Sequence, residues 1–176
     1  MARAARSVWF FAFPNSELLD LVGPWEVLGH ANEVLGRRAY ALELVTPHGA
    51  EVRTRHGLVV GGGRRLRAGG LPDVAFVAGG SPYLPLPPGE ARLARWLRRR
   101  GGRLPALVSI CTGAFVLGEA GLLEGRRVTT HWRFLEDLRA RFPGASVVEE
   151  GIFVRDGALW TSAGVTSGVD LTLALV

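Results

Sequence analysis

The chain has 176 residues and a formal net charge of +5, and all 21 of its basic residues are arginine because the sequence contains no lysine. This length suits one domain that buries its core without disulfides, and the single cysteine, Cys111, excludes an internal disulfide. No segment approaches the roughly 18 apolar residues of a membrane span and none is patterned as a signal peptide, so we expect a cytoplasmic protein that binds no membrane.

The first half of the chain predicts alternating strands and helices. Residues 7–13 form an apolar run that ends at Pro14, which indicates a buried strand. Ser16 is a candidate helix cap, but Gly23-Pro24 interrupts the helical pattern, so we expect the helix proper to begin near Pro24 after a structured lead-in. The next segments predict, in order, a strand at 39–46, a hairpin at 51–55 and 58–60, a mobile arginine-rich loop after residue 63, and a strand at 71–78.

In the middle of the chain a buried strand, a tight turn and a helix follow one another directly. Residues 106–110 are mostly apolar and predict a strand covered on both faces, and a helical pattern begins at Gly113. Cys111 therefore occupies the bend, as the reactive residue of a nucleophile elbow does. Free amides and the positive end of the helix dipole favour a thiolate there, so we expect a lowered thiol pKa. A lone cysteine is more often a small buried hydrophobe, but the elbow position favours chemistry.

The last third of the chain completes an α/β pattern. We expect a strand at 126–132, a helix at 133–141, short strands at 146–149, 152–155 and 158–161, and an apolar helix up to Val176. Because that helix has no stop signal, we expect a domain cut from a longer protein. Strands that alternate with helices predict a mainly parallel sheet covered on both faces, with ligands at the carboxyl ends of the strands.

Four candidate site segments fall just beyond predicted strand ends, and we expect them to share one cleft: Asp20, Gly79-Gly80, Cys111 and His131. Asp20 lies between apolar residues, so its carboxyl needs a donor or has a raised pKa; a helix cap is the plainer alternative. The paired glycines suit close approach of backbone amides to an anion, although such pairs are also common turns. The four histidines lack ligand spacing, so we expect no metal site.

Arginines gather in two clusters, at residues 64–67 and 92–103. One interpretation is a surface that tracks phosphates. The second cluster, however, interleaves its arginines with Leu93, Trp96 and Leu97 at helical spacing. We prefer the solvated face of an amphipathic helix, because no recognition-helix motif accompanies the charge.

Five segments in this order resemble the ThiJ/PfpI family: residues 19–27, 78–80, 109–114, 128–132 and 161–170. The likeness covers nearly the whole chain, so we expect residues 1–176 to form one ThiJ/PfpI-like domain. It implies an α/β fold, a flavodoxin-like three-layer sandwich of the class I glutamine amidotransferase-like superfamily, with a nucleophile elbow. It also implies a homodimer without a cofactor.

The resemblance assigns roles position by position. It implies that Cys111 is the reactive residue, that Asp20 hydrogen-bonds its sulfur, and that the Gly80 amide forms part of an oxyanion site, with Gly79 and Gly113 beside it in the ligand-binding set. Thr112 stands where protease-like members carry histidine, which argues against peptidase activity. His131 is a candidate to approach the thiol from the next strand.

Two subgroups share the Cys-Thr-Gly sequence. In isonitrile hydratases the matching residues imply that Cys111 attacks the substrate carbon, Asp20 donates and recovers the proton, Thr112 orients substrate or water, and the Gly80 amide stabilises negative charge. In AraC-type transcription regulators of the GlxA kind, the fold senses a small molecule and a separate helix-turn-helix module binds DNA. Residues 152–157 and 160–164 look more like the regulators.

We therefore expect the sensing and dimerisation domain of an AraC-type regulator, which reaches DNA only through a carboxyl-terminal domain of about 100 residues or more that follows Val176. The alternative is an isonitrile hydratase that uses Cys111 and Asp20. A third interpretation is redox sensing, through oxidation of Cys111 to sulfenic or sulfinic acid.

Overall fold

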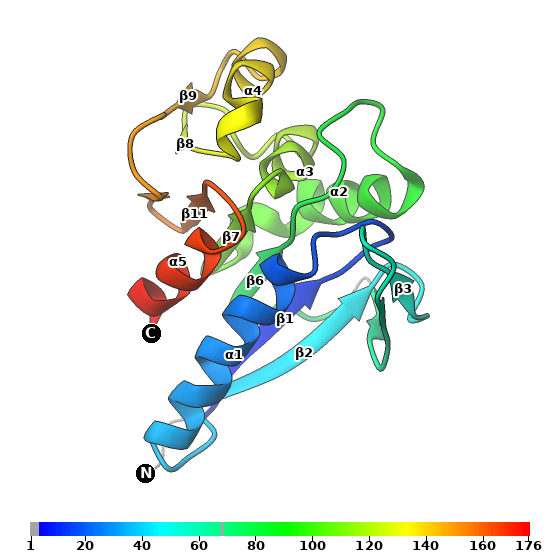
Figure 1. Ribbon diagram of the computed structural model, residues 1–176, viewed down its shortest axis with the longest axis vertical. Coiled ribbons are helices and arrows are strands. Elements are labelled where there is room, and N and C mark those ends of the chain that lie inside the picture. The colour runs from blue at the N-terminus through cyan, green and yellow to red at the C-terminus, as the bar shows by residue number, and fades with distance from the viewer. Residues whose placement is uncertain (1–3, 68) are drawn as a thin grey trace.

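A seven-stranded sheet runs through the computed structural model, which describes residues 4–67 and 69–176 (Figure 1). Its order is β10-β11-β7-β6-β1-β2-β5, and every neighbouring pair is parallel except β10 with β11. The strands are β1 (Arg6–Phe11), β2 (Tyr40–Thr46), β5 (Arg64–Arg65), β6 (Val74–Val77), β7 (Ala106–Ile110), β10 (Phe153–Asp156) and β11 (Leu159–Ser162). The central strands are continuous apolar runs because both of their faces are covered.

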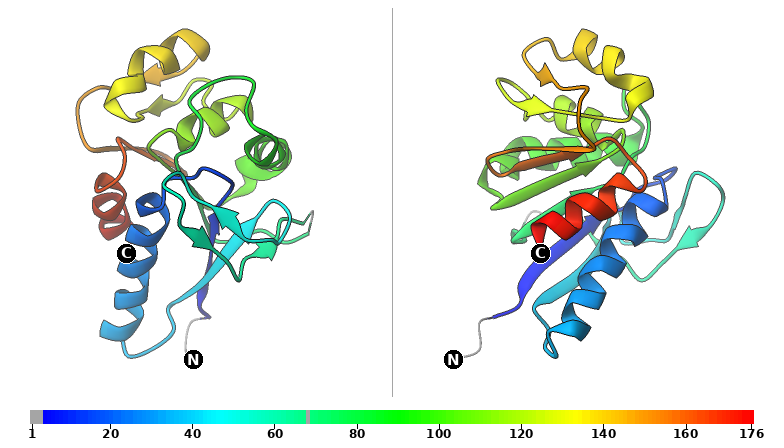
Figure 2. Two further views of the ribbon diagram at one scale, coloured as in Figure 1. Left: turned by 45° about the vertical axis from the view of Figure 1, so that its right-hand side comes forward. Right: turned by 60° about the vertical axis from the view of Figure 1, so that its left-hand side comes forward.

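Helices cover the sheet on both faces, as Figure 2 shows. One face carries α1 (Leu19–Val34) and α5 (Ser167–Leu175), and the other carries α2 (Pro88–Arg100) and α3 (Gly113–Glu119). α4 (Leu135–Arg141) lies beyond α3, outside the large sheet (Figure 2). Alternate residues of β1 divide between the two cores, with Val8 and Phe10 on the α1 side and Trp9 and Phe11 on the α2 side. The predicted three-layer, flavodoxin-like sandwich is confirmed.

Smaller elements lie outside the large sheet. The predicted hairpin is confirmed as β3 (Val52–Arg53) antiparallel to β4 (Val59–Val60). β8 (Arg127–Val128) pairs in parallel with β9 (Ser146–Val147), and two short 3-10 helices are η1 (Gly101–Arg103) and η2 (Trp132–Phe134). Within residues 4–67 and 69–176 no helix has the length and apolar character needed to cross a bilayer.

The first helix begins earlier than predicted. α1 starts at Leu19 and contains Pro24, and Ser16 does not cap it, because its hydroxyl donates to the Phe13 carbonyl at 2.6 Å. Pro24 is the sixth residue of α1, so it removes the amide that would donate to the Asp20 carbonyl and its ring crowds that carbonyl, yet the helix continues through it. The consequence matters for the site, because it places Asp20 in the first turn of α1.

The arginine-rich segment predicted as a mobile loop is instead the edge strand β5. Residues 64–65 pair with residues 45–46 of β2. Arg64 also donates from Nε to the Glu43 carboxylate at 2.5 Å and places its guanidinium 3.8 Å from the centre of the Trp9 ring. These tertiary contacts fix a short strand that composition alone describes as a loop.

The strand predicted at 126–132 is also wrong beyond its first residues. Only Arg127–Val128 pairs with a neighbouring strand, and that ladder is separate from the seven-stranded sheet. The Thr129 amide donates to the Thr161 hydroxyl at 2.8 Å, so a side chain takes the donor that a ladder would use. His131 consequently precedes η2 and does not end a strand of the sheet.

Candidate functional site

Cys111 occupies the bend between β7 and α3, as predicted. Its φ is +55°, in the left-handed region that residues with a side chain rarely adopt, so the elbow is strained. The Cys111 amide donates to the Ser162 carbonyl at 3.2 Å, and its carbonyl accepts from the Thr130 hydroxyl at 2.8 Å. Two neighbouring segments thus hold the strained bend in place.

Glycines flank the Cys111 side chain on two sides. A Cβ on Gly79 would lie 3.0 Å from the cysteine Cβ and 2.7 Å from Asp20 Oδ2. A Cβ on Gly164 would lie 3.1 Å from the sulfur, and Gly164 has a φ of +128° that favours glycine. The side chain of Cys111 therefore lies between two close backbone segments, and the residue is only 8 % exposed.

Asp20 is completely buried beside the elbow and ties two loops together. Its Oδ2 accepts from the Gly79 amide at 2.8 Å and its Oδ1 from the Val165 amide at 3.1 Å. Burial raises the pKa of Asp20 to about 7 and the nearby Glu17 carboxylate adds to this, while the two amide donors oppose it. The sequence predicts either a donor partner or a raised pKa for this carboxyl, and the structure shows both.

The thiol of Cys111 is not the low-pKa group that the elbow position predicts. Burial raises its pKa to about 12, and the charge of Asp20 raises it further, while hydrogen bonding from Thr112 lowers it. The loss of water around the sulfur is the largest of these effects. The prediction of a lowered pKa is wrong, and the thiol is neutral at physiological pH.

Two hydrogen bonds join Thr112 and Gly80. The Gly80 amide donates to Thr112 Oγ1 at 3.0 Å, and the Thr112 hydroxyl donates to the Gly80 carbonyl at 2.9 Å. A hydroxyl has one proton, so the Thr112 hydroxyl donates either to the Gly80 carbonyl or to the Cys111 sulfur, and not to both at once. The amide expected to serve an oxyanion and the hydroxyl expected to orient a substrate thus lock the loop after β6 onto the elbow.

Gly113 lies at the start of α3, where the sequence predicts a ligand contact. A Cβ there would approach the Val77 carbonyl to 2.6 Å and the Ala78 carbonyl to 2.9 Å. Neither backbone oxygen can move aside as a flexible side chain would. The structure therefore gives this glycine a packing role, which is to let α3 approach the end of β6.

His131 follows Thr130 directly, and the charge of Glu17 acts on the pKa of His131 as it does on those of Asp20 and Cys111. Its ring packs against Trp132 and Phe134, and its Nδ1 accepts from the Arg133 amide at 3.3 Å. Partial burial lowers the pKa of His131, and the positive charges of Arg133 and Arg55 lower it further. The residue of this segment that contacts the elbow is Thr130, through the hydroxyl bond to the Cys111 carbonyl.

Sequence reasoning missed a second buried carboxyl near the elbow. Glu90, in the first turn of α2, is 1 % exposed, and both of its oxygens accept from the Ser81 amide at 3.2 Å. Burial raises its pKa to about 7. A Cβ on Gly80 would lie 3.0 Å from the Glu90 carboxyl carbon, so the Glu90 side chain packs directly against the glycine loop. The acidic residue in the first helical turn was the signal available in the sequence.

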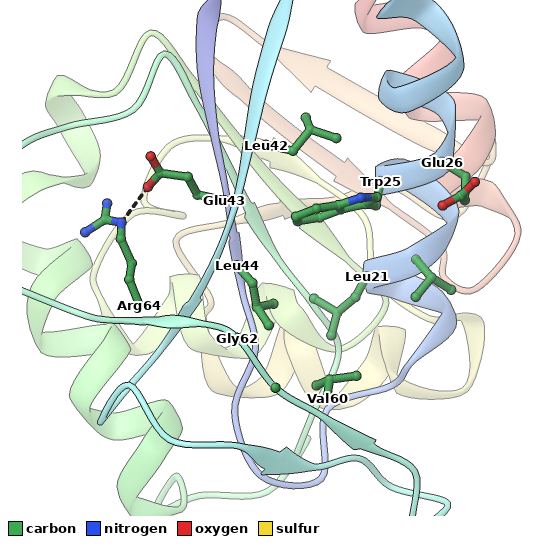
Figure 3. A pocket seen from close by; sticks show the side chains of 11 residues that line it. Leu21, Trp25, Glu26, Leu42, Glu43, Leu44, Val60, Gly62 and Arg64 are labelled. Atoms are coloured by element: carbon green, nitrogen blue, oxygen red, sulfur yellow. Dashed lines mark hydrogen bonds and ion pairs between the residues drawn. The ribbon is translucent and has the colours of Figure 1, made fainter. Parts of the chain in front are cut away.

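A large groove lies on the α1 side of the sheet, away from the sulfur (Figure 3). Its volume is about 640 Å³, and Cys111 is not among its lining residues. Leu21 and Trp25 of α1 face Leu42 and Leu44 of β2 across it, and Val60 lies at one end. Across the parts of the chain that the structure describes, no group of three His, Cys, Asp or Glu side chains is placed to hold a metal ion.

The fold and the elbow define the class: an α/β sandwich with a buried cysteine at a strained strand-to-helix turn and a buried carboxyl beside it. The model of the DJ-1/PfpI family matches residues 6–176, and the chain belongs to this family. The sequence resemblance to ThiJ/PfpI proteins is thereby confirmed.

Relatives within the family divide between an enzyme and regulators. Isonitrile hydratase of Pseudomonas putida is 36 % identical over 171 residues, which cover 97 % of this chain and 71 % of the hydratase. The HTH-type transcriptional regulator CdhR of Pseudomonas aeruginosa is 33 % identical over 98 % of this chain and 50 % of the regulator, so the chain spans half of that protein. A THiJ/PfpI family protein of Pseudomonas syringae superposes with a TM-score of 0.78 at 27 % identity, covering 98 % of this chain and 68 % of that one.

Proposed function

We propose that residues 1–176 form the small-molecule-sensing and dimerisation domain of an AraC-type transcription regulator. The observation that carries the proposal is the link between the elbow and the last helix. Asp20 Oδ1 accepts from the Val165 amide at 3.1 Å, and Gly164 packs against the Cys111 sulfur. A ligand that changes the charge or position of either side chain would therefore also change the conformation of the loop that precedes α5.

The neutral thiol also favours sensing over catalysis. The nucleophilic form of cysteine is the thiolate, and a pKa of about 12 leaves very little of it at neutral pH. A binding site needs no thiolate, because a buried neutral thiol and a carboxyl that titrates near neutrality already provide a donor and an acceptor. In this proposal DNA contact belongs to a separate domain of the regulator, as the half-length match to CdhR suggests.

An isonitrile hydratase is the second candidate, and the grouping of Asp20, Cys111 and Thr112 around Gly79 favours it. In that reaction the sulfur would bond to the isonitrile carbon, which takes up a proton and becomes a thioimidate. Water would then add to this carbon, and the carbon–sulfur bond would break to release the N-substituted formamide and the thiol. Asp20, with a pKa of about 7, is suited to pass the proton in both steps.

Hydrogen–deuterium exchange of α5 tests the sensing proposal. Asp20→Asn leaves one acceptor oxygen for the two amides of Gly79 and Val165 and removes the carboxylate charge. The Val165 loop is then held more weakly, so amides of Ser167–Leu175 should exchange several-fold faster than in the wild type. Glu90→Gln is the matched control, because it changes a buried carboxyl whose partner is Ser81 and should leave exchange in α5 unchanged. Equal exchange of α5 in Asp20→Asn and wild type would remove the link on which the proposal depends.

Turnover of an isonitrile separates the two candidates. The purified protein is incubated with cyclohexyl isonitrile, and formamide is measured together with a Cys111→Ala control. Sensing predicts no multiple turnover by either protein. Many formamide molecules per chain, lost in Cys111→Ala, would establish the hydratase and overturn the sensing proposal.

A further inference from the structure

Four arginines surround a small hollow on the α2 side of the sheet. The hollow has a volume of about 190 Å³ and lies between α2 and the segment that follows β5. Its lining residues are Leu66, Arg67, Arg92, Arg95, Trp96 and Arg99. Because helical neighbours are three or four residues apart, the three α2 arginines share one face of that helix. Leu93 and Leu97 are buried beneath them, as the amphipathic pattern predicts.

None of these four arginines has an acidic partner in the described parts of the chain. The arginines that form ion pairs there are Arg64, Arg126 and Arg139. Four positive charges therefore face one hollow without a counter-charge, and like charges at this spacing repel. The solvated helix face expected from the sequence accounts for the burial of Leu93 and Leu97, but not for four arginines without acidic partners around one hollow.

Arg92 is one of the four arginines that line the hollow, and part of its side chain is buried. Its Nε is buried and has no hydrogen-bond partner among the residues that the structure describes. The other end of its guanidinium donates weakly to the Leu66 carbonyl at 3.5 Å. Buried donors nearly always find an acceptor, and a charged donor loses most when it has none. Because this Nε is closed to solvent, an anion in the hollow would contact the outer nitrogens of Arg92, for which the described residues supply only the long bond to Leu66.

The walls of the hollow are held in place. The Trp96 indole nitrogen donates to the Arg67 carbonyl at 3.0 Å, which joins α2 to the segment after β5. Trp96 is buried and packs against Trp9 at a ring-centre distance of 6.0 Å. The arginine backbones are therefore fixed before any ligand arrives, which reduces the entropy lost on binding.

We propose that this hollow binds the phosphate or diphosphate group of a small molecule. The guanidinium fork matches the geometry of phosphate oxygens, and such an anion supplies the missing counter-charge to the four arginines that line the hollow. A single bounded hollow suits a small molecule better than a nucleic-acid backbone, which is followed by a track of basic residues. The proposal goes beyond the sensing function and does not depend on Cys111.

Calorimetric titration with pyrophosphate at constant ionic strength tests the site. Wild type should bind one pyrophosphate per chain, and Arg95→Gln/Arg99→Gln should weaken binding by about tenfold or more, the loss typical of a charged hydrogen bond. Both arginines are exposed, so the fold should persist, and Arg95→Gln alone repeats the test if the double variant does not fold. Arg37→Gln/Arg38→Gln is the matched control, since it removes the same charge from the exposed turn after α1 and should bind like wild type.

Three results would overturn the proposal. Wild type that does not bind pyrophosphate lacks the site. Equal weakening in the two double variants would show an effect of net charge alone. A short DNA duplex, titrated in parallel, that binds in an Arg95- and Arg99-dependent way while pyrophosphate does not would assign the arginines to nucleic acid instead.

Discussion

The environment of Cys111 shows how burial and charge decide the state of one side chain. The elbow geometry and a helix start are features that activate cysteines elsewhere. Here the residue is 8 % exposed and the carboxyl of Asp20 lies beside it, and both raise the thiol pKa. The thiol pKa therefore depends on whether Asp20 is ionised, and the pKa of Asp20 itself is about 7.

Asp20→Asn should therefore raise the reactivity of the thiol, but only where Asp20 is ionised. At pH 8.5 the wild-type carboxylate disfavours the thiolate, so alkylation by iodoacetamide should be several-fold faster in the variant, at roughly tenfold per pKa unit. At pH 5.5 the carboxyl is protonated in wild type as well, and the two rates should be similar. Because Cys111 is the only cysteine of the chain, the labelled mass reports this site alone.

The two pH values separate charge from access. A variant that merely opened the loop would react faster at both pH values. Glu33→Gln, an exposed charge change near the other end of α1, should react like wild type at both. Equal rates of Asp20→Asn and wild type at pH 8.5 would contradict the assigned effect of the Asp20 charge.

At the scale of elements, close packing of α3 on β6 explains a glycine that the sequence assigns to ligand binding. Gly113 faces two backbone carbonyls, whereas a Cβ added to Gly29, in the middle of α1, would have no neighbouring atom within 4 Å, and its φ is ordinary. The same substitution should consequently have opposite effects at the two positions. The difference isolates packing from helix propensity, because both glycines lie within helices.

Gly113→Ala should destabilise the protein by about 1–3 kcal/mol, the usual cost of overpacking, because neither carbonyl can retreat. Gly29→Ala should stabilise it by about 0.5–1 kcal/mol, since alanine loses less backbone entropy in a helix. Urea unfolding followed by circular dichroism measures both changes. Stability equal to wild type in Gly113→Ala would show that α3 shifts freely on β6.

Strands with an apolar run or a clear turn signal were predictable from sequence, whereas β5 and the position of His131 were not. The apolar runs of β1, β6 and β7 specify covered strands by themselves, and the carboxyl ends of parallel strands bring Asp20, Gly79 and Cys111 together. By contrast, β5 depends on the contacts of Arg64 with Glu43 and Trp9, which are distant in sequence. The position of His131 was mispredicted because a threonine side chain takes the backbone donor that a strand ladder would use.

The grouping of Asp20, Cys111 and Thr112 around Gly79 was predictable from sequence, but its electrostatics were not. Burial depth and loop closure depend on the whole fold, so the direction of the Cys111 pKa shift was not available from local pattern. Glu90 illustrates the same limit, because an acid in the first turn of an arginine-rich helix is ordinarily a solvated residue. The fold buries this carboxyl against the Gly80 loop, where both of its oxygens accept from the Ser81 amide.

At the scale of the whole molecule, two buried carboxyls with raised pKa values make the stability depend on pH in an unusual direction. The pKa of Glu90 is about 7 in the folded protein and near its ordinary value of 4.5 in the unfolded chain. Between these values the folded state holds a proton that the unfolded state has lost, so stability falls as pH rises from about 4.5 to 7. Asp20 acts in the same direction from its ordinary pKa of 3.8 upward.

Glu90→Gln should remove its share of this pH dependence. The stability of wild type relative to the variant should fall by roughly 1–3 kcal/mol between pH 4.5 and 7.5, as measured by urea unfolding at each pH. The subtraction is needed because His131, whose folded pKa is lowered, makes stability rise with pH below 6.5 in both proteins. A constant difference between wild type and Glu90→Gln across this range would show that the carboxyl ionises as readily in the folded protein as in the unfolded chain.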